Sequence, residues 1–238
     1  MATAKQGNAA ADTLLQLLTR DYYPARTAAD EPFVVRYDTP SVMVRLRGNS
    51  GLKQRLAADY YRATHKAATS AALADVLNTA EGMSYGKRPV TPALRIARHG
   101  DELFLDLGRP DGAAVLVSAH GWRVVSRPPV LFARTALTGE LPVPQPGSGS
   151  LDAVRGLFNV GPPAEWALFI ACRIASLFPA ITHPIETLTG PAGSAKTSTT
   201  RLMANWVDPA PVMMPQYFGL NGCVPNIWPY TATGEYLN

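Results

Sequence analysis

Residues 190–197 read Gly-Pro-Ala-Gly-Ser-Ala-Lys-Thr, and this run constrains the fold more than any other part of the sequence. A loop of small residues that ends in Lys-Thr at the start of a helix lets phosphate oxygens approach main-chain N–H groups. The dipole of the following helix favours the same anion. Residues 185–189 (Ile-Glu-Thr-Leu-Thr) are the candidate strand before the loop. The run therefore predicts the opening of an α/β phosphate-loop domain.

The residue types in this loop suit nucleotide phosphates. Lys196 would reach the β- and γ-phosphates, and the Thr197 hydroxyl would hold Mg²⁺, so ATP and Mg²⁺ are the predicted cofactors. Ala195 stands where glycine is usual, and its methyl group is tolerated if φ is negative and the Cβ points away from the phosphate. The candidate nucleotide-binding residues are Gly190, Ala192, Gly193, Ser194, Ala195, Lys196, Thr197 and Ser198.

The whole chain is expected to have a mixed α/β (α+β) fold. A Pro/Gly/Ser-rich stretch, residues 139–150, is the best candidate for a linker, because such compositions rarely form regular structure. It separates a helical N-terminal part and a small antiparallel β module from the start of the phosphate-loop domain. The predicted segments are 1–88 (mainly helical), 89–138 (β module), 139–150 (linker), 151–212 (helices and phosphate loop) and 213–238 (atypical tail).

Hydrophobic periodicity places the elements within these segments. Residues 1–11 are expected to fray, with Asp12 capping the first helix, and one helical pattern runs over 52–78. Further helices are expected over 151–158, 164–178 and 197–207. The candidate strands are 33–37 and 42–46, then 94–97, 103–107, 114–117, 122–125 and 130–132 in the β module.

The basic residues point to a second possible partner. Lys and Arg number 22 against 18 Asp and Glu, and the excess lies within residues 1–100. Cations near Tyr60 and Tyr61 on a helix could contact a nucleic-acid backbone. A solvated helix face with its tyrosines in the core explains the same pattern. The candidate DNA-contacting residues are Arg45, Arg47, Lys53, Arg55, Arg62 and Lys66.

Several classes of protein are disfavoured by the sequence. With 47% hydrophobic and 17% charged residues, the chain can form a core, which argues against general disorder. Its two cysteines, Cys172 and Cys223, are too far apart for a zinc motif. Neither a signal peptide nor a membrane span is expected, so the predicted location is the cytoplasm. The four histidines are scattered, and no catalytic triad is indicated.

The parts needed for hydrolysis are not evident. A phosphate-loop ATPase also needs an acidic residue at the end of an apolar strand (Walker B) to hold Mg²⁺ and position water. After Thr197 the only carboxylates are Asp208 and Glu235, and neither ends such a strand; no arginine follows Arg201. We therefore assign no catalytic residue and expect phosphate release barely above background.

The order of segments also carries a resemblance. The β module, the linker LPVPQPGSGS, the helix EWALFIACRIASLFP and then GPAGSAKTSTTRLMANWVDP resemble a family of actinobacterial and phage ATP-binding proteins. These are similar to poxvirus-type primase-helicases, with ATPases of superfamily 3 and AAA+. The resemblance covers roughly residues 50–212. The residues that match its one specific motif, the Walker A loop, are Gly190, Gly193, Lys196 and Thr197, with Ala195 in the glycine slot.

The resemblance implies a ring-forming ATPase that works on DNA during replication of a mobile element. Relatives continue into the Walker B motif, so this chain is expected to be truncated after Walker A. Residues 213–238, which contain no Lys or Arg, fit a shifted reading frame, an artificial junction or a natural short ending. The predicted function is ATP binding by the N-terminal part of a replication-type helicase. A non-enzymatic folded remnant is the alternative; a small-molecule kinase is disfavoured because ~190 residues precede the loop.

Overall fold

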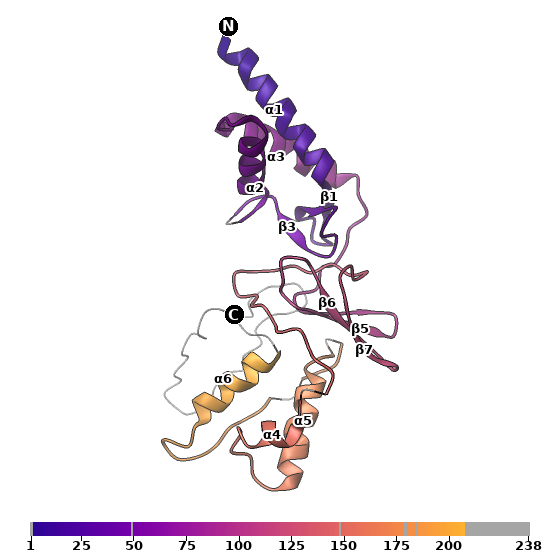
Figure 1. Ribbon diagram of the computed structural model, residues 1–238, viewed down its shortest axis with the longest axis vertical. Coiled ribbons are helices and arrows are strands. Elements are labelled where there is room, and N and C mark those ends of the chain that lie inside the picture. Colours follow the sequence, from indigo (N-terminus) through magenta and orange to yellow (C-terminus); the bar gives the residue numbers. More distant parts are fainter. Residues whose placement is uncertain (1, 49, 148, 179, 184, 208–238) are drawn as a thin grey trace. The chain divides into compact units, whose positions relative to one another are not determined.

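The computed structural model describes residues 2–48, 50–147, 149–178, 180–183 and 185–207. The chain divides into two compact units. Unit 1 contains residues 1–106 and 110–134, and unit 2 contains residues 107–109 and 135–238. Helices and antiparallel sheets together make a mixed α/β fold, as predicted (Figure 1).

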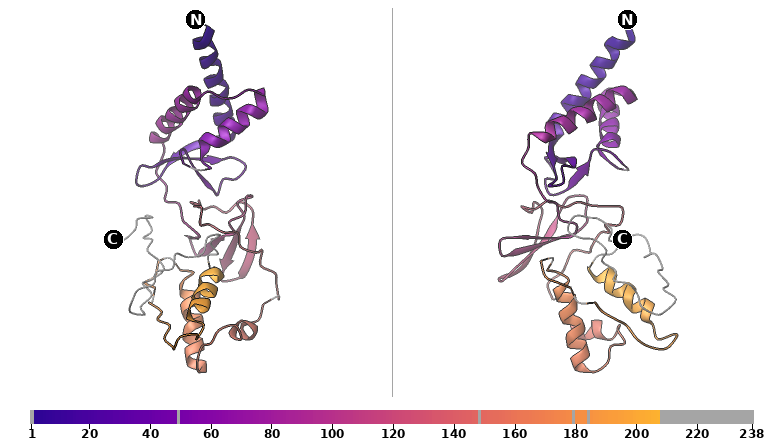
Figure 2. Two further views of the ribbon diagram at one scale, coloured as in Figure 1. Left: turned by 90° about the vertical axis from the view of Figure 1, so that its left-hand side faces the viewer. Right: turned by 180° about the vertical axis from the view of Figure 1, so that it is seen from behind.

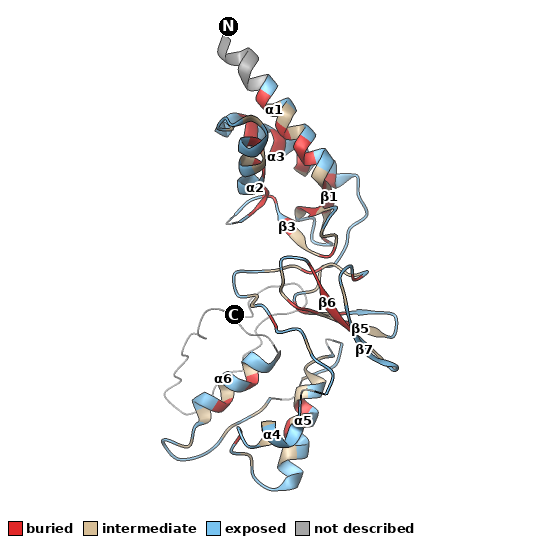
Figure 3. Ribbon diagram, viewed as in Figure 1, coloured by how far each residue is buried: buried red, intermediate tan, exposed pale blue. Residues whose placement is uncertain are grey.

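Three helices form the N-terminal core of unit 1: α1 (Ala2–Asp21), α2 (Leu52–Thr64) and α3 (Ser70–Tyr85). The expectation that residues 1–11 fray is wrong for the backbone from Ala2, because an alanine-rich start favours helix and Asp12 lies inside α1 instead of capping it. Figure 3 shows buried residues recurring along these helices, which pack through Leu14, Leu18, Leu52, Leu56, Leu73, Val76 and Leu77.

The single helix predicted over 52–78 is wrong, because the structure breaks it into α2 and α3. His65 ends α2 in the left-handed conformation with φ of 55°, and its N–H donates to the Tyr61 carbonyl. Thr69 then starts α3, its hydroxyl accepting a hydrogen bond from the Ala72 N–H at 3.2 Å. This side-chain cap satisfies one of the free N–H groups at a helix start.

A three-stranded antiparallel sheet lies beside these helices, in the order β1 (Tyr22–Arg26), β2 (Pro32–Arg36) and β3 (Met43–Arg45). The strands predicted at 33–37 and 42–46 are confirmed as β2 and β3. Strand β1 was not predicted, since it contains Pro24. Proline is tolerated there because β1 is an edge strand and pairs only with β2.

The β module forms a four-stranded antiparallel meander (Figure 2). Its strands are β4 (Ile96–His99), β5 (Glu102–Asp106), β6 (Ala114–Ser118) and β7 (Gly121–Val125), so four of the five predicted strands are confirmed within two residues. Side chains alternate between faces, which places Phe104 opposite Leu116 on the core face. That face packs on Ala97, Ala114 and Phe132.

The fifth predicted strand, residues 130–132, does not join this sheet. Phe132 instead forms isolated bridges with Val42 and Ala93. Its N–H donates to the Ser41 carbonyl at 2.8 Å, and its carbonyl accepts from the Met43 N–H at 2.9 Å. Through these bridges the segment connects to the residues beside β3, while the fully buried Phe132 side chain packs in the core of the β module.

Unit 2 contains three described helices: α4 (Leu151–Arg155), α5 (Pro163–Ala175) and α6 (Lys196–Val207). An aromatic cluster holds them together, with Phe158 and Phe169 ring centroids 4.9 Å apart and Phe158 and Trp206 5.9 Å apart. The strand predicted over 185–189 is wrong: these residues have no regular structure. No strand is present among the described residues of unit 2.

None of the helices within the described ranges combines the length and the apolar character that a membrane crossing requires.

Candidate functional site

The loop at residues 190–195 adopts a backbone that few residue types tolerate. Gly190, Gly193 and Ala195 all have positive φ, at 157°, 78° and 60°. A Cβ at Gly190 would lie 2.7 Å from the Ser194 Oγ, so only glycine fits there without a shift of that hydroxyl. The Ser194 N–H donates to the Pro191 carbonyl at 3.3 Å, which closes the turn.

The Lys196 ammonium is folded back over this loop. Its Nζ donates to the Gly190 carbonyl at 2.8 Å and the Pro191 carbonyl at 2.7 Å, and it lies 3.2 Å from the Ser194 Oγ. An ammonium has three donors, so these contacts use all of them. A phosphate oxygen that replaced one carbonyl would add the attraction between two opposite charges to the hydrogen bond.

Helix α6 presents its N-terminus beside the ammonium. The first bond into the helix runs from the Thr199 N–H to the Ala195 carbonyl at 2.9 Å. The N–H groups of Lys196, Thr197 and Ser198 precede it and have no acceptor one turn earlier within the helix. Thr197 and Ser198 are exposed, so their amides and hydroxyls are accessible to a ligand. This combination of free amides, helix dipole and cation suits an anion.

Ala195 differs from what the sequence analysis expects. Its φ is positive, which places it in the left-handed region where a Cβ is costly. The usual glycine at this position meets the same conformation without strain, so the departure from the motif has a direct structural cost.

Replacement of Ala195 by glycine is therefore expected to stabilise unit 2. The relief of about 1–2 kcal/mol of backbone strain outweighs the entropy that glycine gains in the unfolded chain, about 0.4–1 kcal/mol. Urea unfolding followed by tryptophan fluorescence measures the change. Ala192→Gly is the matched control, because φ at Ala192 is not positive and the same substitution should destabilise. A loss of stability in Ala195→Gly as large as that in Ala192→Gly would contradict this assignment of strain.

Two features hold the loop in place. Met203 and Trp206 attach α6 to the aromatic cluster around Phe169. Before the loop, Glu186 forms an ion pair with Arg173 of α5, whose guanidinium lies 5.5 Å from the centre of the Phe169 ring. Burial lowers the pKa of Arg173.

Sequence reasoning missed this ion pair and the lysine contact to Pro191. The two charges of the pair lie 13 residues apart and follow no helical spacing that would have suggested the contact.

The basic residues proposed for DNA do not form one set. Arg47 lies 2.9 Å from the Asn78 Oδ1 and 3.4 Å from Glu81, and Arg62 pairs with Asp59. Arg45 lies on β3, and Arg55 donates to the Ser50 carbonyl. All six, Arg45, Arg47, Lys53, Arg55, Arg62 and Lys66, are exposed.

The two tyrosines beside these cations lie in different surroundings. Tyr60 is buried in the core, whereas Tyr61 is exposed and meets His65 edge-on at 6.0 Å. The solvated-face explanation holds for Tyr60, and Tyr61 remains accessible.

Several residues that the sequence analysis considered lie outside the described residues. Asp208, Glu235, Cys223 and the predicted tail 213–238 lie outside the described residues. Within the described ranges, no group of three His, Cys, Asp or Glu side chains could hold a metal ion. Thr197 lies in the first turn of α6 and is exposed.

Comparisons with known proteins identify no relative of this chain. No family model matches the chain, and neither the curated proteins nor the solved structures contain a match.

Proposed function

We propose that this chain binds ATP, with Mg²⁺, through residues 190–198. The observation that carries the proposal is the Lys196 ammonium, held by loop carbonyls at the start of α6. In this proposal Lys196 turns from the carbonyls to the β- and γ-phosphates, and the loop amides bind phosphate oxygens. Mg²⁺ would supply charge neutralisation between the phosphates, with Thr197 as its protein contact.

We further propose a cellular role for this nucleotide-binding loop. The chain would act in the cytoplasm as the nucleotide-binding part of a replication-type helicase, whose full-length relatives form rings on DNA. DNA contact through the six basic residues is supported by their exposure. The alternative, a folded remnant without nucleotide binding, makes the opposite prediction for the experiment below.

Lys196→Ala is expected to weaken binding of a fluorescent ATP analogue by about tenfold or more, because a hydrogen bond to a charged group contributes about 1.5–3 kcal/mol. Fluorescence titration in the presence of Mg²⁺ measures it. Arg201→Ala is the matched control, since Arg201 is an exposed cation of the same helix and its replacement removes the same charge. An equal loss of affinity in both variants would reduce the effect to general electrostatics and overturn the assigned role of Lys196.

A further inference from the structure

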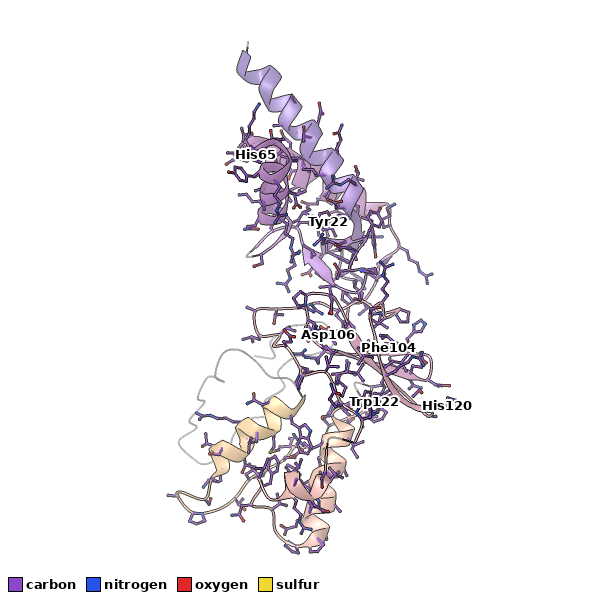
Figure 4. All side chains as sticks on the ribbon, in the orientation of Figure 1. Tyr22, His65, Phe104, Asp106, His120 and Trp122 are labelled. Atoms are coloured by element: carbon purple, nitrogen blue, oxygen red, sulfur yellow. The ribbon has the colours of Figure 1, made fainter. Side chains whose placement is uncertain are left out.

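Unit 1 has a surface hollow to which no function has been assigned above. It encloses about 360 Å³ and is formed where α1 ends, β1 begins and the segment after α3 passes. Tyr22, at this junction, is labelled in Figure 4. The volume falls in the range of small-molecule sites, about 300–1,000 Å³. The described residues that line the hollow include two cations, Lys87 and Arg88, and no carboxylate.

One side of the hollow is aromatic. The rings of Tyr23 and Tyr37 lie 5.4 Å apart with a tilt of 44°. The Tyr37 N–H donates to the Asp21 carbonyl at 3.1 Å, which fixes its backbone, while its side chain remains 54% exposed. Burial, and then the neighbouring Tyr37 hydroxyl, raise the pKa of Tyr23, so the phenol stays neutral and does not repel an anion. An exposed ring beside a half-buried one offers a surface on which a flat group can stack.

The other side is cationic and held in place by the backbone. The Lys87 N–H donates to the Ser84 carbonyl at 3.0 Å, and the Lys87 carbonyl accepts from the Arg26 Nε at 3.0 Å. Arg26 is itself paired with Asp30. Lys87 and Arg88 are exposed, and within the described part of the chain neither has an ion-pair partner. Their charges are therefore available to a ligand.

We propose that this hollow binds a nucleotide unit, with its base against Tyr23 and Tyr37 and its phosphate at Lys87 and Arg88. A flat aromatic group that carries negative charge is the chemistry that complements both sides, and a base linked to a phosphate has it. A free mononucleotide and a nucleotide within a single strand of nucleic acid present the same groups. The site is independent of Lys196, since it is built from unit 1 alone.

The test uses the full chain with Lys196→Ala, so that the loop at 190–197 contributes little. The first probe is AMP, whose binding is measured by calorimetry. The second is a fluorescein-labelled oligothymidylate of about eight nucleotides, measured by fluorescence anisotropy. Its length lies within the ~4–16 nucleotides that single-strand binding sites cover. Binding of either probe is expected to weaken about tenfold in Tyr37→Ala. Trp122→Ala is the matched control, because Trp122 is also an exposed aromatic residue, at 44%, but lies on β7.

The charged side is tested in the same way. Lys87→Ala with Arg88→Ala is expected to weaken binding and, for the oligonucleotide, to reduce the salt slope by about 0.7 for each phosphate that the variant no longer neutralises. Arg123→Ala with Arg127→Ala removes the same charge from exposed positions of the β module and should have a smaller effect. A fall in affinity specific to the hollow variants supports the proposal, and the probe affected identifies the source of the nucleotide. Failure of both probes to bind, or equal effects in the control variants, would overturn it.

Discussion

Arg134→Leu is expected to lower the free energy of unfolding of unit 1 by about 3–5 kcal/mol, because it removes a bidentate ion pair from a buried carboxylate. Asp106 is fully buried, and its two carboxylate oxygens accept from Arg134 Nε and Nη2 at 2.8 and 2.6 Å. Hydrogen exchange at the Phe104 and Leu116 amides, in the centre of the β module, measures the loss of stability.

The same substitution at an exposed pair is the control. Arg98 lies 3.5 Å from Asp101, and both side chains are exposed, so Arg98→Leu should cost no more than about 1 kcal/mol. Similar losses of stability at both positions would show that the burial of Asp106 contributes nothing to the strength of its pairing.

Phe169→Ala is expected to destabilise unit 2 by about 3–5 kcal/mol, since it empties the centre of the aromatic cluster. The centroid of the Phe169 ring lies 4.9 Å from that of Phe158, 5.4 Å from that of Trp166 and 6.4 Å from that of Trp206. Trp206 belongs to α6, so this variant should also release the helix that carries Lys196 and weaken nucleotide binding indirectly. Tryptophan fluorescence during urea unfolding reports the stability change.

Leu168→Ala provides the comparison on the adjacent position of α5. Its side chain is 66% exposed, against 7% for Phe169, and its truncation should change stability by less than about 0.5 kcal/mol. If Leu168→Ala cost as much as Phe169→Ala, the exposed face of α5 would be covered by packing that the described residues do not show.

The elements that the sequence predicts well are those in which pattern and packing agree. Strands β4–β7 alternate with turns at positive-φ glycines such as Gly100 and Gly121, and α5 follows a long apolar pattern. The break at His65 was missed because a histidine in the left-handed conformation has no sequence signature. Thr69, followed by a helical pattern, was the signal that a second helix begins there.

The candidate site was predictable in its residues and less so in its geometry. The small residues, Lys196 and the start of α6 follow from the motif, whereas the strand expected over 185–189 depended on neighbouring strands that the sequence pattern does not supply. The positive φ at Ala195 reverses the sequence expectation. Alanine normally avoids that conformation, so only the folded loop shows that it is adopted.

Calorimetric titration of ATP with Mg²⁺ into the wild-type chain and into Lys196→Ala tests the central claim most directly. The account predicts a phosphate-loop site in the wild type, separate from the hollow in unit 1, with an affinity that falls from ATP to ADP to AMP because the loop contacts phosphates. In the variant this site is expected to lose about tenfold or more in affinity. ATP binding of equal strength by the two proteins, or no binding by either, would contradict it.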